Sequence, residues 1–144
     1  ALPIIREHFP PELIEDNGDS IVVTSRRDFT TYILSEDERG IVIAYEGERN
    51  TVVPFCITQS LELAATCLTL LARDGIATLT DMSYTPQDLL GPLPHTAFTI
   101  SKKSPPFFEL TSTIDPTVSA TCRSFACARA IAEASAPSLD SLRP

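Results

Sequence analysis

Acidic side chains form the densest group of chemically active residues in this sequence. Glu36, Asp37 and Glu38 are consecutive. Glu46 and Glu48 follow two positions apart, so on an extended strand they face the same side. Clustered carboxylates could bind a divalent cation or a basic protein segment. We interpret these five as solvated loop acids and predict that they contact a partner protein.

The four cysteines lack the spacing of a metal site. They are Cys56, Cys67, Cys122 and Cys127, and no two form a C-x-x-C pair. Cys122 and Cys127 fall on a predicted helix about 140° apart around its axis, which cannot place both thiolates on one metal ion. We therefore predict buried free thiols that act as small apolar residues. The spacing leaves open a disulfide between cysteines that are distant in the sequence.

Histidine and glycine usage argues against common catalytic and cofactor sites. His8 and His95 could form a metal site, or His95 a nucleophile pair with a cysteine, only by converging from distant segments. We interpret them as ordinary polar residues. None of the five glycines lies in a phosphate-binding loop, a G-x-G-x-x-G turn or a G-x-S-x-G elbow. We expect no cofactor and no bound metal.

An enzyme of another kind stays open as an alternative. Hydrolysis of sugars by paired carboxylates needs a cleft and usually aromatic platforms, but the chain has no tryptophan and only three tyrosines. A cofactor-independent enzyme could build its pocket from serine, threonine, tyrosine and carboxylate side chains, although no motif nominates them. We expect a protein that is not an enzyme.

Charge and hydropathy narrow the kinds of partner. The net charge is −8; residues 1–72 hold 12 acidic and 5 basic side chains, whereas residues 73–144 hold 7 and 6. This negative field repels nucleic-acid backbones and anionic lipid. No apolar run approaches the roughly 20 residues that span a bilayer, and the N-terminus lacks the order of a secretory signal. We predict an intracellular protein, or one within an assembled particle, with protein partners, no direct nucleic-acid contact and no membrane contact.

The pattern of residues 58–75 predicts a helix that other elements enclose. Glu62, Thr66, Thr69 and Arg73 fall on one narrow stripe at about 100° per residue, and leucine, alanine and cysteine fill the other sides. A helix with so thin a polar stripe is buried on most sides. We expect its five leucines, at positions 61, 63, 68, 70 and 71, to contribute to the core.

Residues typical of strands flank this helix on both sides. The predicted strands are 20–25, 29–34, 40–45, 51–57, 76–80, 95–101 and 107–113. The second and third form a hairpin whose tip carries the acidic run. Asp115-Pro116 has the form of a helix start, with an N-cap aspartate and a proline at the first position, and predicts a helix over 116–134.

These elements predict an α+β fold, with a mainly antiparallel sheet, a buried central helix and a C-terminal helix. We find no internal repeats. We divide the chain into an extended N-terminal arm (1–19), a single α+β domain (20–134) and a C-terminal tail (135–144). The tail has few apolar anchors beyond Leu139 and Leu142, so we expect neighbouring subunits to hold it.

The missing catalytic motifs, the two arms and the 12 prolines favour a non-catalytic structural or interaction subunit of a larger assembly. A virus or phage particle, or an organellar complex, would use such a subunit. The alternative is a small acidic chaperone or adaptor that binds a basic client. The order of elements is similar to that of dimeric secretion chaperones, without a shared motif.

Overall fold

The computed structural model describes residues 9, 11–25, 29–47, 49, 51–80, 91–93, 96–104 and 106–140, with side chains through residue 135. Within these residues the chain forms one antiparallel sheet of nine strands, in the order β1-β2-β3-β4-β5-β9-β8-β7-β6. The strands are β1 (Ile14–Asp16), β2 (Ser20–Thr24), β3 (Thr31–Asp37), β4 (Gly40–Glu46), β5 (Val52–Thr58), β6 (Gly91–Pro92), β7 (Phe98–Lys102), β8 (Phe108–Ser112) and β9 (Ser119–Cys122). The helical elements are η1 (Pro11–Leu13), α2 (Leu61–Asp74), α3 (Ile76–Leu79) and α4 (Phe125–Asp140).

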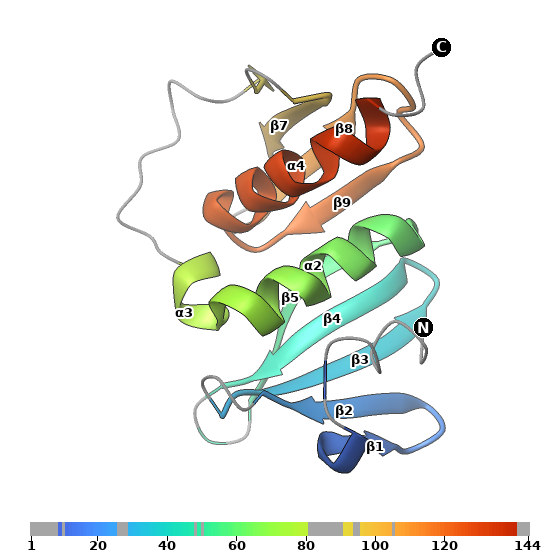
Figure 1. The fold of residues 1–144 in the computed structure, drawn as a ribbon, viewed down its shortest axis with the longest axis vertical. Coiled ribbons are helices and arrows are strands. Elements are labelled where there is room, and N and C mark those ends of the chain that lie inside the picture. Colours follow the sequence, from blue (N-terminus) through green and yellow to red (C-terminus); the bar gives the residue numbers. More distant parts are fainter. Residues whose placement is uncertain are drawn as a thin grey trace.

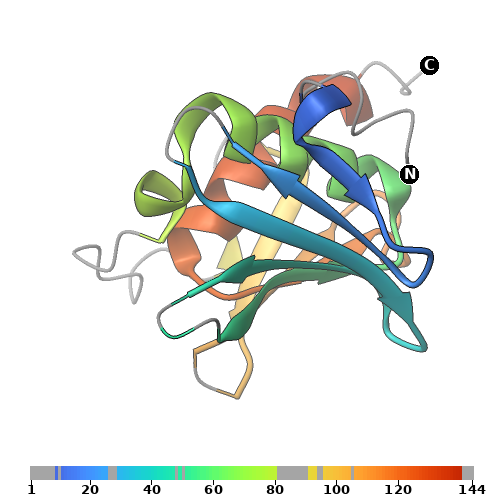
Figure 2. The same cartoon turned by 90° about the horizontal axis from the view of Figure 1, so that it is seen from below.

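The two long helices cover one face of the sheet. Figure 1 shows α2 and α4 side by side in front of the strands, with α3 at the end of α2. Figure 2, seen from below, shows the sheet curving around them. The protein is therefore a mixed α+β protein with an antiparallel sheet, as the sequence predicts. None of the described helices has the length and apolar character needed to cross a membrane.

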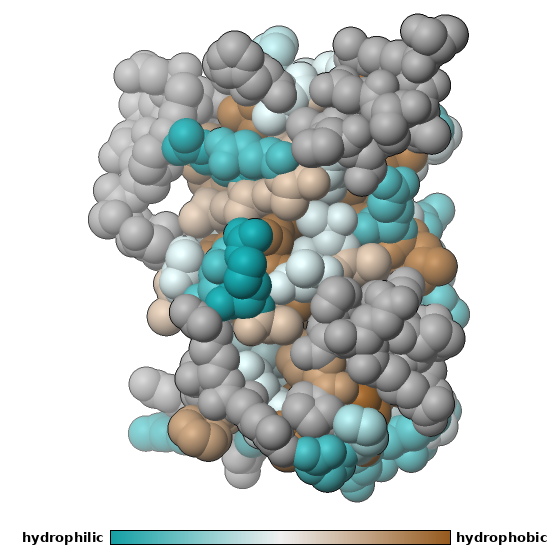
Figure 3. All heavy atoms as spheres, in the orientation of Figure 1, coloured by the Kyte–Doolittle hydropathy of each residue, from teal (hydrophilic) through white to brown (hydrophobic). Residues whose placement is uncertain are grey.

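The strands form because apolar residues alternate with residues that face outward. In β3, Tyr32 and Leu34 are buried while the residues between and beside them are half-buried. The register places Leu34 opposite Ile43, and Ile43 opposite Cys56, so these side chains share the inner face. They join the buried side chains of the helices in one core. On the outside of the helix-covered face, hydrophilic residues stand beside apolar ones (Figure 3).

Helix α2 carries its apolar residues toward this core. Its N-cap is Ser60, whose Oγ accepts a hydrogen bond from the N–H of Leu63 at 3.2 Å. The buried side chains are Leu63, Ala64, Cys67, Leu68, Leu70 and Leu71. The expectation that all five leucines contribute to the core is wrong for Leu61, which is 50% exposed. Leu61 is the first residue of the helix and lies beside the β3–β4 hairpin instead of over the sheet.

The sheet consists of two halves of matching topology. Each half is a run of four antiparallel strands followed by a helix: β2 to β5 with α2, and β6 to β9 with α4. Ser124 holds the same place in the second half as Ser60 in the first. Its Oγ accepts from the N–H of Cys127 at 3.0 Å, three residues further on, as that of Ser60 accepts from Leu63.

The register where the halves meet is symmetric as well. Strands β5 and β9 pair with Cys56 opposite Cys122 and Thr58 opposite Ala120. Aligning Ser60 with Ser124 along the sequence places Cys56 at the position of Ala120 and Thr58 at the position of Cys122. Each of the two pairs therefore maps onto the other. An approximate two-fold axis therefore passes through the middle of this ladder, although the sequence shows no internal repeat. We call the β5–β9 ladder with its two helices the seam.

The region after β8 differs from the predicted helix over 116–134. Strand β9 occupies part of it, and α4 begins later, with Ser124 as its capping residue. The Asp115 carboxylate instead closes a turn between β8 and β9, accepting from the N–H and the Oγ1 of Thr117 at 3.1 and 2.6 Å. Aspartate followed by proline is as typical of a β-turn as of a helix start, and here the turn forms.

A short helix, α3, replaces the strand predicted over 76–80. The N–H and the Oγ1 of Thr80 both donate to the carbonyl oxygen of Ile76, at 3.0 and 2.8 Å, and so close one helical turn. Leu79 is buried by this turn. Packing against the core therefore outweighs the strand propensity of the isoleucine and threonines in this segment.

Parts of both predicted arms lie against the body of the domain. Phe9 is buried, with its ring centroid 6.4 Å from that of Tyr32. Strand β1 pairs with β2, and α4 runs to residue 140. The division into arm, domain and tail stays a prediction, because residues 1–8 and 141–144 lie outside the described residues.

The turn at Asp115 gives a prediction for pH dependence. Hydrogen bonds from the side chain and then from the backbone N–H of Thr117 lower the pKa of Asp115 below 3.8. Since this pKa is lowered in the folded state, the charged carboxylate stabilises the fold above about pH 4, and the contribution is lost as pH falls through the folded-state pKa. We expect Thr117→Val to raise the pKa of Asp115 in an NMR titration of the carboxyl carbon. An unchanged pKa would contradict the role given to this hydroxyl.

Candidate functional site

The acidic run lies at the tip of the β3–β4 hairpin. Asp37 pairs with Gly40 across a two-residue turn made of Glu38 and Arg39. The guanidinium of Arg39 lies 2.7 Å from the carboxylate of Asp37, and these hydrogen bonds lower the pKa of Asp37. Among the described residues no ion pair involves Glu36 or Glu38, whose side chains are exposed. Two carboxylates at this tip are therefore available to a partner.

A surface hollow of about 510 Å³ opens beside this tip. Its lining residues are Glu36, Asp37, Glu38, Gly40, Ile41, Gln59 and Leu61. We call it the acidic hollow. The carboxylates come from the hairpin, while Gln59 and Leu61 come from the connection between β5 and α2 and the first residue of the helix. The hollow is therefore built where the hairpin tip meets the start of α2.

The acidic hollow combines acidic and apolar groups. Leu61 is 50% exposed, and Ile41 is half-buried against the core. A smaller hollow of about 160 Å³ adjoins it and shares Glu36 and Ile41, adding Asp19, Ile21 and other residues. Such a surface suits a segment that carries positive charge and an apolar side chain together.

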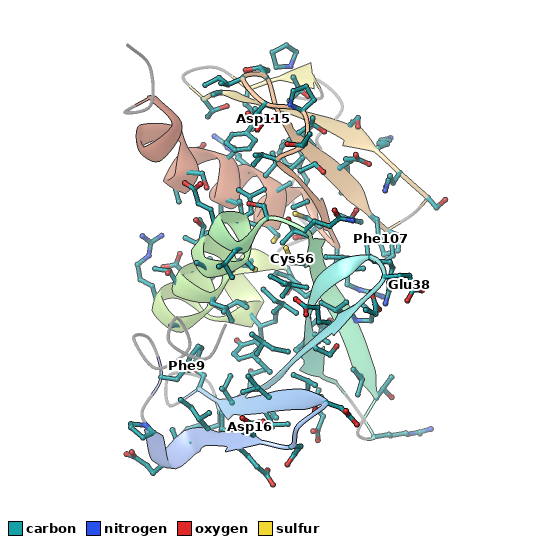
Figure 4. All side chains as sticks on the ribbon, turned by 90° about the vertical axis from the view of Figure 1, so that its right-hand side faces the viewer. Phe9, Asp16, Glu38, Cys56, Phe107 and Asp115 are labelled. Carbon is teal, nitrogen blue, oxygen red and sulfur yellow. The ribbon has the colours of Figure 1, made fainter. Side chains whose placement is uncertain are left out.

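A third hollow, a groove of about 610 Å³, crosses the seam and shares Gln59 with the acidic hollow. Arg39 from the first half and Phe107 from the second both line it. Figure 4 shows Glu38 and Phe107 both on the side of the sheet away from the helices. The guanidinium of Arg123 lies over the ring of Phe107, 5.4 Å from its centroid. The groove therefore extends the candidate surface across both halves.

One wall of this groove carries an ion pair beside a hydroxyl group. The Nζ of Lys103 lies 3.0 Å from Glu109 and donates to the Oγ1 of Thr121 at 3.4 Å. Further hydroxyl groups, from Thr58, Thr117 and Ser119, line the groove. The hydroxyl of Thr58 is buried and already donates to the carbonyl oxygen of Ser119. The more exposed hydroxyls of Thr117 and Ser119 can hydrogen-bond to the backbone or to polar side chains of a bound segment.

The structure does not bring all of the predicted partner-binding acidic residues together at one site. Glu46 lies at the end of β4 opposite to the hairpin tip, a strand length of roughly 20 Å away at about 3.3 Å per residue. Glu48 and Leu142 lie outside the described residues, as do His8 and His95. Leu139 lies in α4, but its side chain is not described.

The four cysteines lie on four different elements, and each is buried. The geometric argument that placed Cys122 and Cys127 on one helix is wrong, because Cys122 ends β9 and Cys127 belongs to α4. The prediction of buried free thiols is confirmed. In the described part of the chain, no three histidine, cysteine, aspartate or glutamate side chains form a group that could hold a metal ion.

Sequence reasoning missed the apolar half of the hollow. Ile41 falls in the strand predicted over 40–45, and Leu61 is one of the leucines expected in the core, so neither local pattern indicates a surface hollow. They flank the acidic tip only because β4 and the start of α2 meet there. The sequence signal available was Gly40, which marks the tight turn that brings the tip over the β5–α2 connection.

The fold and surface define an antiparallel α+β domain with an acidic, partly apolar hollow. Comparisons with protein-family models, with curated proteins and with solved structures find no match to this chain.

Proposed function

We propose that this chain is a non-catalytic interaction subunit of a larger multi-chain assembly, and that its acidic hollow holds a basic segment of a neighbouring protein. The observation that carries the proposal is the meeting, in one hollow, of an exposed leucine and two carboxylates that form no ion pair with any residue the structure describes. Glu36 and Glu38 supply the charge and Leu61 the apolar contact.

Charge complementarity favours a basic segment as the partner bound in the acidic hollow. A lysine or arginine side chain places a long apolar stem along Leu61 and Ile41 while its head reaches the carboxylates. The adjoining small hollow and the seam groove extend the surface in two directions, which suits an extended segment better than a compact ligand. The net charge of −8 adds a field that speeds the approach of a basic partner.

Within this proposal, α2 is the central scaffold helix, and the chain ends are arms that contact neighbouring subunits. Buried leucines of α2 fix the position of its first residue, so they also fix Leu61 against the hairpin tip. The helix therefore supports the binding surface.

A pair of double variants tests the binding role. We expect Glu36→Gln/Glu38→Gln to lower affinity for a protein that co-purifies with the tagged chain by about 3- to 30-fold, since each exposed ion pair is worth roughly 0.3–1 kcal/mol. The measurement is a titration with that purified partner by biolayer interferometry, at low and at high salt.

The matched control is Glu46→Gln/Glu133→Gln, which also removes two exposed carboxylates but away from the hollow. It should bind like the wild type. Equal loss in both double variants would assign the effect to net charge and contradict the proposed site. A defined large particle in the purified complex supports the assembly subunit, whereas a single unfolded basic client supports the acidic chaperone instead.

A further inference from the structure

The four thiols converge at the seam. Cys56 lies on β5 and Cys122 on β9, while Cys67 and Cys127 come from the two helices packed above them. All four are 0% exposed. Figure 4 shows Cys56 in the interior, between the helices and the sheet. A sequence with four cysteines thus gathers every one of them where its two halves meet.

Cys56 and Cys122 face each other directly across two strands. The N–H of Arg123 donates to the carbonyl oxygen of Phe55 at 2.8 Å, so the flanking residues are a hydrogen-bonded pair and the two cysteines occupy the adjacent non-hydrogen-bonded position. At that position the Cα atoms of opposite residues are about 4.5 Å apart, within the range of disulfides. The backbone geometry at this position therefore permits a disulfide between Cys56 and Cys122.

Of Cys56 and Cys122, the neighbouring thiols favour Cys56 as the thiolate that attacks. Thiols of Cys122 and Cys67 donate hydrogen bonds to the sulfur of Cys56, and these lower the pKa of Cys56. Burial raises the pKa of Cys127, and the adjacent thiols of Cys122 and Cys67 raise it further. Cys56 is thus the first thiol of the cluster to become a thiolate, the form that attacks.

We propose that Cys56 and Cys122 form a reversible disulfide that joins the two halves of the sheet across the seam. The oxidant is a small disulfide such as oxidised glutathione. The Cys56 thiolate attacks one sulfur of that disulfide, forming a mixed disulfide and releasing one thiolate of the oxidant. The Cys122 thiolate then attacks the Cys56 sulfur, and the second thiolate of the oxidant leaves. Two protein thiols are oxidised, one small disulfide is reduced to two thiols, and the two protons pass to solvent or to the released thiolates.

Burial decides when this reaction takes place. Because the four thiols are inaccessible in the closed domain, the oxidant reaches them during folding or when α2 and α4 separate from the sheet. Once formed, the same burial shields the bond from reductants. The disulfide constrains the chain between residues 56 and 122, so the oxidised form should resist urea better than the reduced form.

The test uses the full chain refolded in a glutathione redox buffer. We expect the intact mass to fall by two hydrogen atoms, peptide mapping to identify a 56–122 bridge, and the unfolding midpoint in urea to rise. Cys67→Ala and Cys127→Ala should retain the bridge, and Cys122→Ala should lose it. Recovery of four free thiols, or of a bridge between other cysteines, would overturn the proposal.

The two-fold symmetry of the seam supplies a second variant. Thr58 and Ala120 occupy the equivalent position in the ladder. In a Cys56→Ala/Cys122→Ala background, Thr58→Cys/Ala120→Cys should form a bridge under the same buffer. If this pair oxidises during refolding and the native pair of the wild type, refolded in the same buffer, does not, the ladder geometry is suitable but the native thiols are not used, and the proposal fails.

Discussion

Leu68→Ala is expected to lower the free energy of unfolding by about 2–5 kcal/mol. Leu68 is 3% exposed, and its side chain lies in the core together with those of Cys67 and Leu71 of the same helix. Removing its methyl groups takes apolar surface out of the core and leaves a cavity that the surrounding sheet and helices only partly fill. Urea denaturation followed by circular dichroism measures the change.

The same helix offers a matched control in Leu61→Ala. Leu61 is 50% exposed, so the same substitution should change the free energy of unfolding by less than about 1 kcal/mol. Equal stability changes in the two variants would show that α2 does not pack as a central helix. Leu61→Ala should instead weaken partner binding, which separates the two roles of the helix.

Gly40→Ala is expected to lower the free energy of unfolding by about 2–4 kcal/mol, from backbone strain and overpacking together. Gly40 has a φ of 118°, which side-chain-bearing residues rarely adopt. A Cβ there would lie 2.6 Å from the carbonyl oxygen of Thr58 and 2.9 Å from the Cγ of Gln59. Because the first neighbour is backbone of β5, the hairpin tip would have to move away from it.

Gly18→Ala separates strain from close contact. Gly18 also has a positive φ, 85°, but a Cβ there meets nothing within 4 Å. This variant should cost only about 1–2 kcal/mol, the backbone strain alone. We expect Gly40→Ala to weaken partner binding as well, since Gly40 lines the acidic hollow. A Gly40→Ala variant no less stable than Gly18→Ala would contradict the contact with β5.

The first half of the fold was predictable because its signals are local. The alternation in β3 and β4, and the apolar faces of α2, are set by residues close in sequence. Ser60 and Gly75 mark the ends of α2 within a few residues of the predicted bounds. The second half was less predictable, because Asp115 followed by proline suits a turn and a helix equally, and only the strand after it decides between them.

The candidate site was predictable only in its charged part. Consecutive acids between two strand-forming runs indicate a hairpin tip, and the tip forms there. Leu61 lies beside this tip because of where β5 ends, and no local sequence pattern specifies that position. The same holds for the cysteines. Cys56 and Cys122 are far apart in sequence and become partners only through the β5–β9 register.

We propose that the acidic hollow contacts a basic segment of a partner protein. Carbodiimide cross-linking of the natively purified complex tests it most directly, because this reagent joins a carboxylate to a lysine without a spacer. We predict that mass spectrometry will find Glu36 or Glu38 joined to lysines of the partner, with Glu46 and Glu133 unlinked. Cross-links from Glu46 or Glu133 with none from the hairpin tip would contradict the account.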